Sequence, residues 1–216
     1  MPSAPRPLID GGCYHVIARG NNRQRVFQDK LAFEYFLKSL QAMKDRYPVR
    51  LYHYCLMPNH IHFLLQIANG PHLPKLMHGL LRGFARWFQH RTSYVGHVWQ
   101  ARFKSPMVND ESYFLEVGRY IERNPIRAGL VDDLREYPWS SYSYYAYGMR
   151  DDLVDEDPYY AQIGSNGQGR QRAYRDFVKI SGPYEGLLDE VLLKRRTYPT
   201  PERRHQPAGK VEAHEP

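Results

Sequence analysis

The chain has 216 residues, of which 42% are hydrophobic and 14% aromatic, and this composition excludes a largely disordered chain. Lys and Arg number 30 against 23 Asp and Glu, so the formal net charge of +7 favours a polyanionic partner without choosing between nucleic acid, a membrane surface and an acidic protein. The two cysteines, Cys13 and Cys55, exclude a disulfide framework and a thiolate zinc site, and no apolar run approaches the ~20 residues of a membrane span. Because the opening residues also lack the apolar segment of a signal peptide, we expect a cytoplasmic protein without membrane contact.

The first predicted elements are a strand, a helix and a pair of strands. The stretch CYHVIARG at residues 13–20 is typical of a strand that ends at a polar, basic turn. Residues 29–47 predict a helix, because Pro48 follows them and apolar side chains recur at helical spacing. Two strands at residues 50–57 and 60–67 are then predicted around a tight turn through Pro58 and Asn59.

A second helix and a fourth strand complete the predicted core. The helix runs from about residue 73 to 91 and has one apolar stripe, made of Leu73, Leu76, Met77, Leu80, Phe84, Trp87 and Phe88. The fourth strand is predicted at residues 97–108. The resulting order β-α-β-β-α-β is that of an α+β, ferredoxin-like antiparallel sheet with helices on one face. A third helix follows, which Asp110 or Ser112 can cap.

We predict three parts in the chain. Residues 8–147 form the domain that holds the sheet and the third helix. Residues 148–198 form an irregular and helical C-terminal extension, because the pattern there weakens into Tyr-rich, acidic and Gly-rich sequence. Residues 199–216 are polar and Pro-rich and are expected to be a disordered tail.

Two histidines stand two residues apart in the predicted strand 60–67. Successive side chains of a strand point to opposite faces, so His60 and His62 share one face and their rings converge. Two neutral imidazoles placed in this way form a platform for a divalent metal. The alternative is a pair of partly buried histidines that bond to backbone or carboxylate groups.

The third predicted helix carries further candidates. Tyr120 and Asn124 are four residues apart and share a helix face, and Arg127 follows one turn later. A phenol with a pKa of about 10 is a poor nucleophile unless a metal or a base assists it, and a nearby two-histidine metal would do so. The alternatives are that Tyr120 is one of many packing tyrosines and that Asn124, before Pro125, marks the end of the helix.

Four stretches in order resemble the single-tyrosine HUH transposases, and most closely the REP-associated tyrosine transposases: YHVIARGNNRQRVF, YHYCLMPNHIHFLLQ, VWQARFKSPMV and YFLEVGRYIERNPIRAGLV. The resemblance spans about residues 11–147. It implies that His60 and His62 bind Mg²⁺ or Mn²⁺, that Tyr120 is the nucleophile and that Asn124 is the third protein ligand. Small insertion-sequence relatives usually have Gln at that third position, whereas the shorter Asn124 resembles the REP-associated branch.

The same resemblance implies an activity and a partner. The implied reaction cleaves and rejoins single-stranded DNA beside a hairpin through a 5′-phosphotyrosine link and a free 3′-OH. Compact members of the family exchange the tyrosine helix between two subunits, whereas the longer REP-associated proteins are expected to act as monomers. We therefore expect a monomer, with a homodimer as the alternative.

Basic residues near aromatic ones suit a DNA partner, since phosphates pair with cations and bases stack on rings. The candidates for DNA contact are Arg19, Arg23, Arg25, Lys75, Arg82, Arg86, Lys104 and Arg127. Each of them could instead belong to an ordinary solvated face.

Two other functions compete with a tyrosine-dependent transposase. One is a domesticated protein that binds DNA hairpins without cutting them. The other is a histidine-metal hydrolase that uses water as its nucleophile. Replacement of Tyr120 by Phe separates the hydrolase from the transposase, and chelation of the metal separates both from the binding protein.

Overall fold

A computed structural model describes residues 8–193 of the chain. The predicted tail at residues 199–216 and the last part of the predicted extension lie outside the described residues. The strands are β1 (Cys13–Arg19), β2 (Val49–Met57) and β3 (His60–Ile67). The α-helices are α1 (Lys30–Arg46), α2 (His72–Thr92), α3 (Glu111–Arg127), α4 (Tyr142–Tyr147), α5 (Gly167–Lys179) and α6 (Glu185–Leu193), and three short 3-10 helices are η1 (Asn21–Arg23), η2 (Leu134–Glu136) and η3 (Tyr160–Ile163).

The three strands form one antiparallel sheet with β3 in the middle, in the order β1-β3-β2. β2 and β3 are joined by the tight turn through Pro58 and Asn59 that the sequence predicts. On one face of β3 lie His60, His62 and Leu64, and the residues between them point to the opposite face. The α+β class and the antiparallel pairing of β2 with β3 are therefore confirmed, although β2 lies at an edge of the sheet and only β3 is central.

The predicted fourth strand at residues 97–108 is wrong as a regular strand. This segment runs antiparallel to β1 but touches it only through isolated bridges, which join Gly20 to Trp99, Ile17 to Lys104 and Tyr14 to Met107. Pro106 lies within the segment and has no N–H to donate, although its carbonyl accepts from His15 N at 3.0 Å. The regular sheet of the described residues therefore has three strands.

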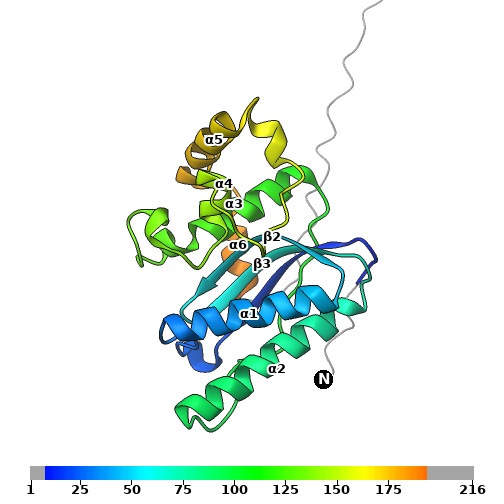
Figure 1. The fold of residues 1–216 in the computed structure, drawn as a ribbon, viewed down its shortest axis with the longest axis vertical. Coiled ribbons are helices and arrows are strands. Elements are labelled where there is room, and N and C mark those ends of the chain that lie inside the picture. The colour runs from blue at the N-terminus through cyan, green and yellow to red at the C-terminus, as the bar shows by residue number, and fades with distance from the viewer. Residues whose placement is uncertain (1–7, 194–216) are drawn as a thin grey trace, which may run out of the picture.

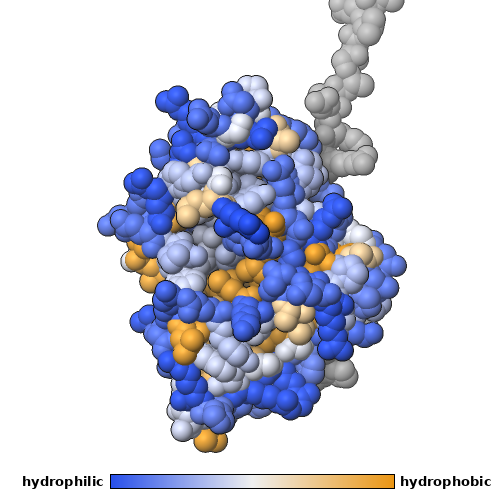
Figure 2. Space-filling view, viewed as in Figure 1, coloured by the Kyte–Doolittle hydropathy of each residue, from blue (hydrophilic) through white to orange (hydrophobic). Residues whose placement is uncertain are grey.

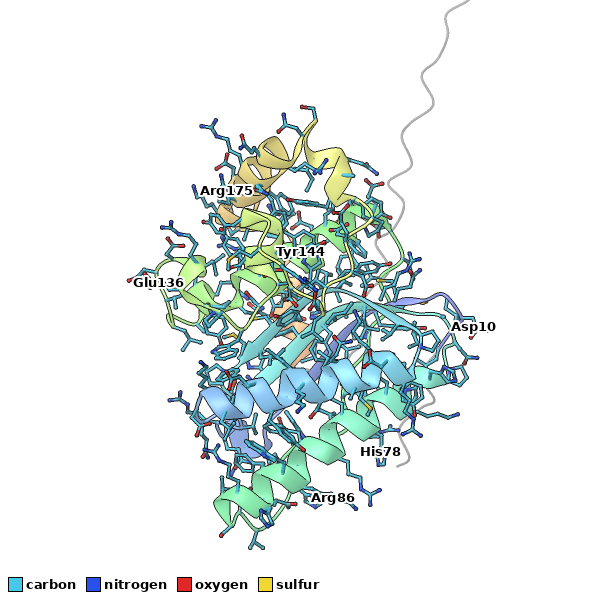
Figure 3. All side chains as sticks on the ribbon, in the orientation of Figure 1. Asp10, His78, Arg86, Glu136, Tyr144 and Arg175 are labelled. Atoms are coloured by element: carbon cyan, nitrogen blue, oxygen red, sulfur yellow. The ribbon has the colours of Figure 1, made fainter. Side chains whose placement is uncertain are left out.

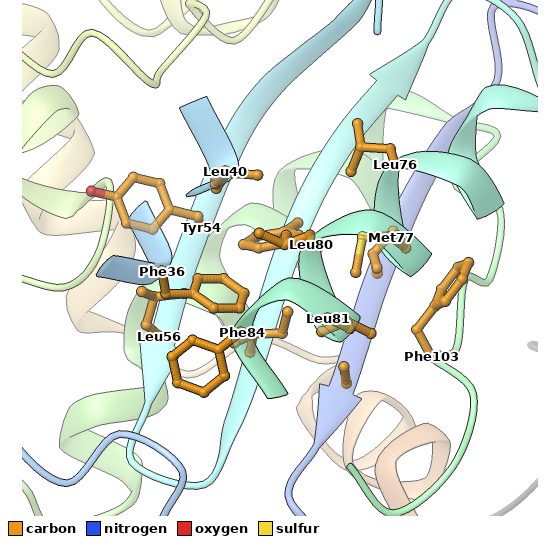
Figure 4. Packing of buried hydrophobic residues seen from close by; sticks show 14 of the residues in the cluster. Phe36, Leu40, Tyr54, Leu56, Leu76, Met77, Leu80, Leu81, Phe84 and Phe103 are labelled. Carbon is orange, nitrogen blue, oxygen red and sulfur yellow. The ribbon is translucent and has the colours of Figure 1, made fainter. Parts of the chain in front are cut away.

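Helices α1 and α2 pack side by side on one face of the sheet (Figure 1). Both were predicted within about one residue at each end. Asp29 caps α1 by accepting from Ala32 N at 3.1 Å. The apolar side chains of both helices meet those of the sheet in the largest core of the molecule, in which Phe36, Leu40, Leu80 and Phe84 are buried (Figure 4).

Helix α3 lies on the other face of the sheet, against β2 and β3. Asp110 accepts from Tyr113 N at 2.9 Å and is therefore the cap of the helix. The apolar stripe of α3 forms a second core with the α3-facing side chains of the sheet. The helix continues through Pro125 to Arg127, so the alternative that it ends at Asn124 is wrong.

The C-terminal segment packs against α3 and α4. A third apolar cluster joins Tyr142 and Tyr145 of α4 to Tyr160, Tyr174 and Val178 of the later residues. Leu188 of α6 is fully buried in the second core. The surface seen in Figure 2 is mainly hydrophilic, with apolar side chains in separate areas. Among residues 8–193, no helix has the length and apolar character that crossing a membrane requires.

Candidate functional site

The two histidines lie on β3, the middle strand of the sheet, at the end next to the β2–β3 turn, and they face α3. His60 is opposite Arg19 of β1 and Met57 of β2, and His62 is opposite Ile17 and Cys55. Both histidines are buried, with relative exposures of 9% and 0%. Their ring centroids are 4.9 Å apart, so the predicted convergence of the two rings is present.

Each histidine has one ring nitrogen engaged and the other unpartnered. His60 Nδ1 lies 2.5 Å from Asn59 Oδ1, and His62 Nδ1 lies 2.9 Å from His15 Nε2. The two Nε2 atoms are buried and have no hydrogen-bond partner within the described residues. A buried polar atom in this state costs about 1–3 kcal/mol, so the pair of Nε2 atoms needs a ligand.

Burial keeps these rings neutral. It lowers the pKa of His60 to about 4, with a smaller contribution from the charge of Arg19. It also lowers the pKa of His62 well below its ordinary value of 6.5, and the pKa of His15 to about 3. Neutral imidazole is the form that binds metals, so these rings are ready for a cation at neutral pH.

His15 is part of this site although the sequence did not single it out. It is fully buried on β1, and its ring stacks on that of His62 with centroids 5.2 Å apart. The alternation of β1 places it on the face that also carries Ile17 and Arg19. A histidine on a strand next to the two-histidine strand is the only signal that could have indicated it.

Tyr120 approaches the histidines from α3. Its ring meets that of His62 edge to face, with centroids 5.7 Å apart, and that of His15 at 6.1 Å. The residue is 1% exposed, and its hydroxyl donates to Asp189 Oδ1 of α6 at 3.0 Å. Burial and the charge of Asp189 raise the pKa of Tyr120, against the opposing effect of Arg127. The phenol is therefore protonated, and α6 covers its hydroxyl.

Asn124 lies one turn after Tyr120 and is 6% exposed. Its Nδ2 donates to Tyr120 O at 2.8 Å and to Ile121 O at 3.4 Å. The second acceptor is the carbonyl that Pro125, which has no N–H, leaves without its usual helical partner. The nitrogen of the amide is thus committed to the backbone, and Oδ1 is the atom that remains for a cation.

Arg127 and Asp189 complete the surroundings of Tyr120. The Arg127 guanidinium lies over the Tyr120 ring, 4.9 Å from its centroid. It also bonds to Asp189 Oδ2 at 2.6 Å and pairs with Glu185 at 3.4 Å. Arg127, predicted to contact DNA, is therefore paired with carboxylates of α6. No sequence pattern indicates Asp189, which lies 69 residues from Tyr120.

A pocket of about 340 Å³ opens beside His60. It is lined by Arg19, Arg25, Asn59 and His60, together with apolar residues of the β2–β3 turn and the segment after α3. Arg19 Nε is buried there without a hydrogen-bond partner in the described chain. Arg19 and Arg25, both predicted to contact DNA, therefore meet at the entrance to the histidine site.

The other predicted DNA contacts lie in two places, near β1 and on the outer side of α2. Lys104 lies in the segment beside β1, where the charge of Arg19 contributes to lowering its pKa after burial. Arg23 is exposed in η1, and its carbonyl accepts from Asn59 Nδ2 at 3.2 Å. Exposed on α2 are Lys75, Arg82 and Arg86, and Figure 3 shows Arg86 on the side of that helix away from the sheet. The sheet separates these three from the histidine site.

The residues present fit a divalent cation. Two buried imidazole nitrogens lack partners, both rings are neutral, and each ring is held through its other nitrogen, which is the usual state of a metal-binding histidine. Within residues 8–193 no group of three or more His, Cys, Asp or Glu side chains is placed to hold a metal. The remaining ligands would thus have to be oxygens of another kind, such as the Asn124 amide, water or a phosphate.

Known proteins resemble this chain in sequence and in fold. A Haemophilus influenzae protein assigned as a REP-associated tyrosine transposase is 24% identical over 152 residues, which cover 66% of this chain and 86% of that protein. The fold is similar to the solved structure of a REP-associated tyrosine transposase bound to a REP hairpin, with a TM-score of 0.56, 19% identity and coverage of 73% of this chain and 93% of that one. The resemblance predicted from the sequence is confirmed.

A match to a family model shows which protein family the chain belongs to. The model described as "Transposase IS200 like" matches residues 10–124, which is more than half of the chain. The match includes His60, His62, Tyr120 and Asn124. The chain therefore belongs to the IS200-like transposase family.

Proposed function

We propose that this chain cleaves and rejoins single-stranded DNA at hairpins of the REP type, with Tyr120 as the nucleophile. The observation that carries the proposal is the pair of buried, unpartnered Nε2 atoms of His60 and His62 beside the ring of Tyr120. A relative whose solved structure holds a REP hairpin supports the class of substrate.

In this proposal His60 and His62, with the amide oxygen of Asn124, hold Mg²⁺ or Mn²⁺. A cation bound there would supply positive charge to polarise an oxygen of the scissile phosphate. Neutral imidazoles and an amide oxygen leave the full charge of the cation available to that phosphate, since none of the three is anionic.

The proposed reaction is a reversible exchange of phosphodiester bonds. The Tyr120 hydroxyl gives its proton to solvent water and its oxygen bonds to phosphorus, while the bond from phosphorus to the 3′ oxygen breaks; the proton that the 3′ oxygen takes from the solvent balances the one released. The electron pair stays on that oxygen, which takes a proton from water and becomes a 3′-OH. A 3′-OH that attacks the 5′-phosphotyrosine reverses these changes and rejoins the strand, so no nucleotide cofactor is needed.

Substrate access requires a change at Tyr120. The residue is 1% exposed and its hydroxyl is bonded to Asp189, so this contact must open before a phosphate can reach the oxygen. The same observation favours the second candidate function, which is binding of hairpins without cleavage. The two candidates differ in whether a covalent adduct forms.

Phosphate contacts are proposed for the basic residues around the site. In this proposal Arg19, Arg25 and Lys104 guide the backbone of the DNA toward His60, and Arg127 takes part when its bonds to α6 open; the position of Arg19 and Arg25 beside His60 supports this. Lys75, Arg82 and Arg86 would contact a more distant part of the DNA. We further propose that the chain acts as a monomer in the cytoplasm, a location that the free thiols of Cys13 and Cys55 fit.

The first prediction concerns the nucleophile. A labelled single-stranded hairpin oligonucleotide, taken from repeats flanking the gene, is incubated with the protein and Mn²⁺ and run on a denaturing gel. The wild-type chain and the matched control Tyr113→Phe, on the same helix face, are expected to give a cleaved strand and a covalent protein–DNA band. Tyr120→Phe is expected to give neither while it still shifts the hairpin in a native gel, because only the attacking oxygen is missing.

Other outcomes separate the competing functions. Addition of EDTA is expected to abolish the wild-type adduct. Cleavage by Tyr120→Phe would remove Tyr120 from the chemistry and support a water-using hydrolase. A gel shift without product from either protein would support the binding function.

A further inference from the structure

We propose that His15 and Asn59 are positioning residues that set the tautomers of His62 and His60, so that both Nε2 atoms present a lone pair to the cation. This inference rests on the proposed function, because the cation site is the one proposed there. Each ring of a neutral histidine carries one proton, and the partner of Nδ1 decides which nitrogen holds it.

Asn59 determines which ring nitrogen of His60 carries the proton, because its amide oxygen faces His60 Nδ1. Its Nδ2 donates to Arg23 O at 3.2 Å, which turns Oδ1 toward His60 Nδ1 at 2.5 Å. The backbone of Asn59 is held in place as well, since its carbonyl accepts from Gly20 N at 2.7 Å. An amide oxygen can only accept, so the proton of His60 lies on Nδ1 and its Nε2 has the lone pair.

His15 likewise determines which ring nitrogen of His62 carries the proton. The nitrogens His15 Nε2 and His62 Nδ1 are 2.9 Å apart, and only one of them can carry a proton in this bond. A proton on His62 Nδ1 leaves Nε2 as a ligand atom. A proton on His15 Nε2 would instead put an N–H on His62 Nε2, a buried atom without an acceptor in the described chain. A cation at Nε2 is compatible with the first arrangement alone.

Both contacts also fix the orientation of the rings. His15 and His62 are fully buried, so water cannot replace His15 as the acceptor. Groups that hold metal-binding histidines in this way commonly change metal affinity by about 10–100-fold when they are replaced. His15 and Asn59 are therefore expected to affect cation binding without touching the cation.

The test compares variants that keep or remove the acceptor. Isothermal titration with Mn²⁺ on the full chain measures the dissociation constant. His15→Leu and Asn59→Ala are expected to weaken binding by about 10-fold or more, whereas His15→Gln and Asn59→Asp, which keep an acceptor oxygen, stay within about threefold of wild type. Both Asn59 variants lose the donor to Arg23 O, so their difference reports the acceptor oxygen together with the negative charge that Asp adds. Ile17→Val, opposite His62 on the same face of β1, is the matched control for packing.

A second measurement reads the tautomers without metal. Nitrogen-15 NMR of the imidazoles in the metal-free chain is expected to show the proton of His60 and of His62 on Nδ1, and the variants without an acceptor are expected to lose this preference at the affected ring. Wild-type Mn²⁺ affinity in His15→Leu and Asn59→Ala, or equal weakening by the paired variants, would overturn the inference.

The two measurements also separate this inference from the proposed function. If Mn²⁺ binds the wild type no better than His62→Ala, the proposed cation site fails, and the role of His15 and Asn59 toward a cation fails with it. The NMR result then still shows whether the two residues set the tautomers. If Mn²⁺ binds through His62 but the NMR shows the proton on Nε2, the cation site stands and the inference falls.

Discussion

The side chain of Asn124 has two roles in this structure. Its Nδ2 bonds to the backbone oxygens of Tyr120 and Ile121, which supports the helix at the point where Pro125 removes an N–H. Its oxygen is the proposed ligand. A structural role and a ligand role can be separated, because they depend on different atoms of the amide.

Two substitutions of Asn124 are expected to act differently. Asn124→Leu removes both atoms, so unfolding is expected to need about 1–3 kcal/mol less free energy and Mn²⁺ affinity is expected to fall. Asn124→Asp loses the donor but keeps an oxygen, so stability falls by a similar amount while Mn²⁺ affinity is retained or increased. Urea denaturation and Mn²⁺ titration of the full chain measure the two quantities. Mn²⁺ binding by Asn124→Leu at wild-type strength would leave Asn124 with a structural role alone.

Some residues of the candidate site could be predicted from the sequence, and others could not. His60 and His62 are two positions apart on a strand, and Tyr120 and Asn124 four apart on a helix, so local spacing places each pair on one face. His15 and Asp189 were missed because their partners lie 47 and 69 residues away, and a lone histidine or aspartate carries no spacing signal. Contacts of that separation arise only from the strand order and from the docking of α6.

Helix α3 approaches β2 closely at Gly118. A Cβ atom on Gly118 would lie 2.9 Å from His53 Nε2 and 3.0 Å from its Cδ2. The His53 ring cannot move away easily, because it is buried and bonded to Glu122 at 3.0 Å and to Asp157 at 3.2 Å. The absence of a side chain at residue 118 therefore sets the distance between the tyrosine helix and the sheet.

Two glycine-to-alanine substitutions in helices are expected to have opposite effects. Gly118→Ala is expected to lower the free energy of unfolding by about 1–3 kcal/mol, because the new methyl group overlaps His53. Gly83→Ala on α2 meets nothing within 4 Å and is expected to raise it by about 0.5–1 kcal/mol, since alanine favours the helix. Thermal and urea denaturation of both variants check the signs. Stabilisation by Gly118→Ala would contradict the close packing of α3 on β2.

Helices and strands could be predicted from the sequence where one periodic pattern of apolar residues extends over many positions. The apolar stripes of α1 and α2 and the paired strands β2 and β3 were predicted for that reason. The segment at residues 97–108, predicted as the fourth strand, has no such pattern, because Trp99, Phe103 and Met107 are spaced by four rather than by two and Pro106 interrupts the backbone donors. Its isolated bridges to β1 are the result.

One buried histidine connects three distant parts of the chain. His53 of β2 bonds to Glu122 of α3 and to Asp157 of the C-terminal segment. Burial alone would lower the pKa of His53, but the hydrogen bonds and charges of Asp157 and Glu122 outweigh it and raise the pKa to about 9. The protonated ring is therefore part of the folded structure at neutral pH.

This histidine and those of the candidate site are expected to give a maximum of stability near pH 6.5. The folded pKa of His53 lies above its unfolded value, so its contribution is complete below about pH 6.5 and is lost as the pH rises through 9, at a cost of up to about 3 kcal/mol. The folded pKa values of His15 and His60, about 3 and about 4, lie below the unfolded value, so stability is lost as the pH falls below 6.5, by about 2 kcal/mol each at pH 5.

Urea denaturation of the metal-free chain at pH 5, 6.5 and 9.5 measures both sides of this maximum. Asp157→Asn removes one of the two carboxylates that hold the charge of His53, so it is expected to move the alkaline loss to lower pH and to leave the acid side unchanged. His15→Gln is expected to reduce the loss on the acid side alone, because one of the buried neutral rings is then absent. A free energy of unfolding that rises steadily from pH 5 to 9.5 would mean that His53 is not held as a cation between α3 and the C-terminal segment.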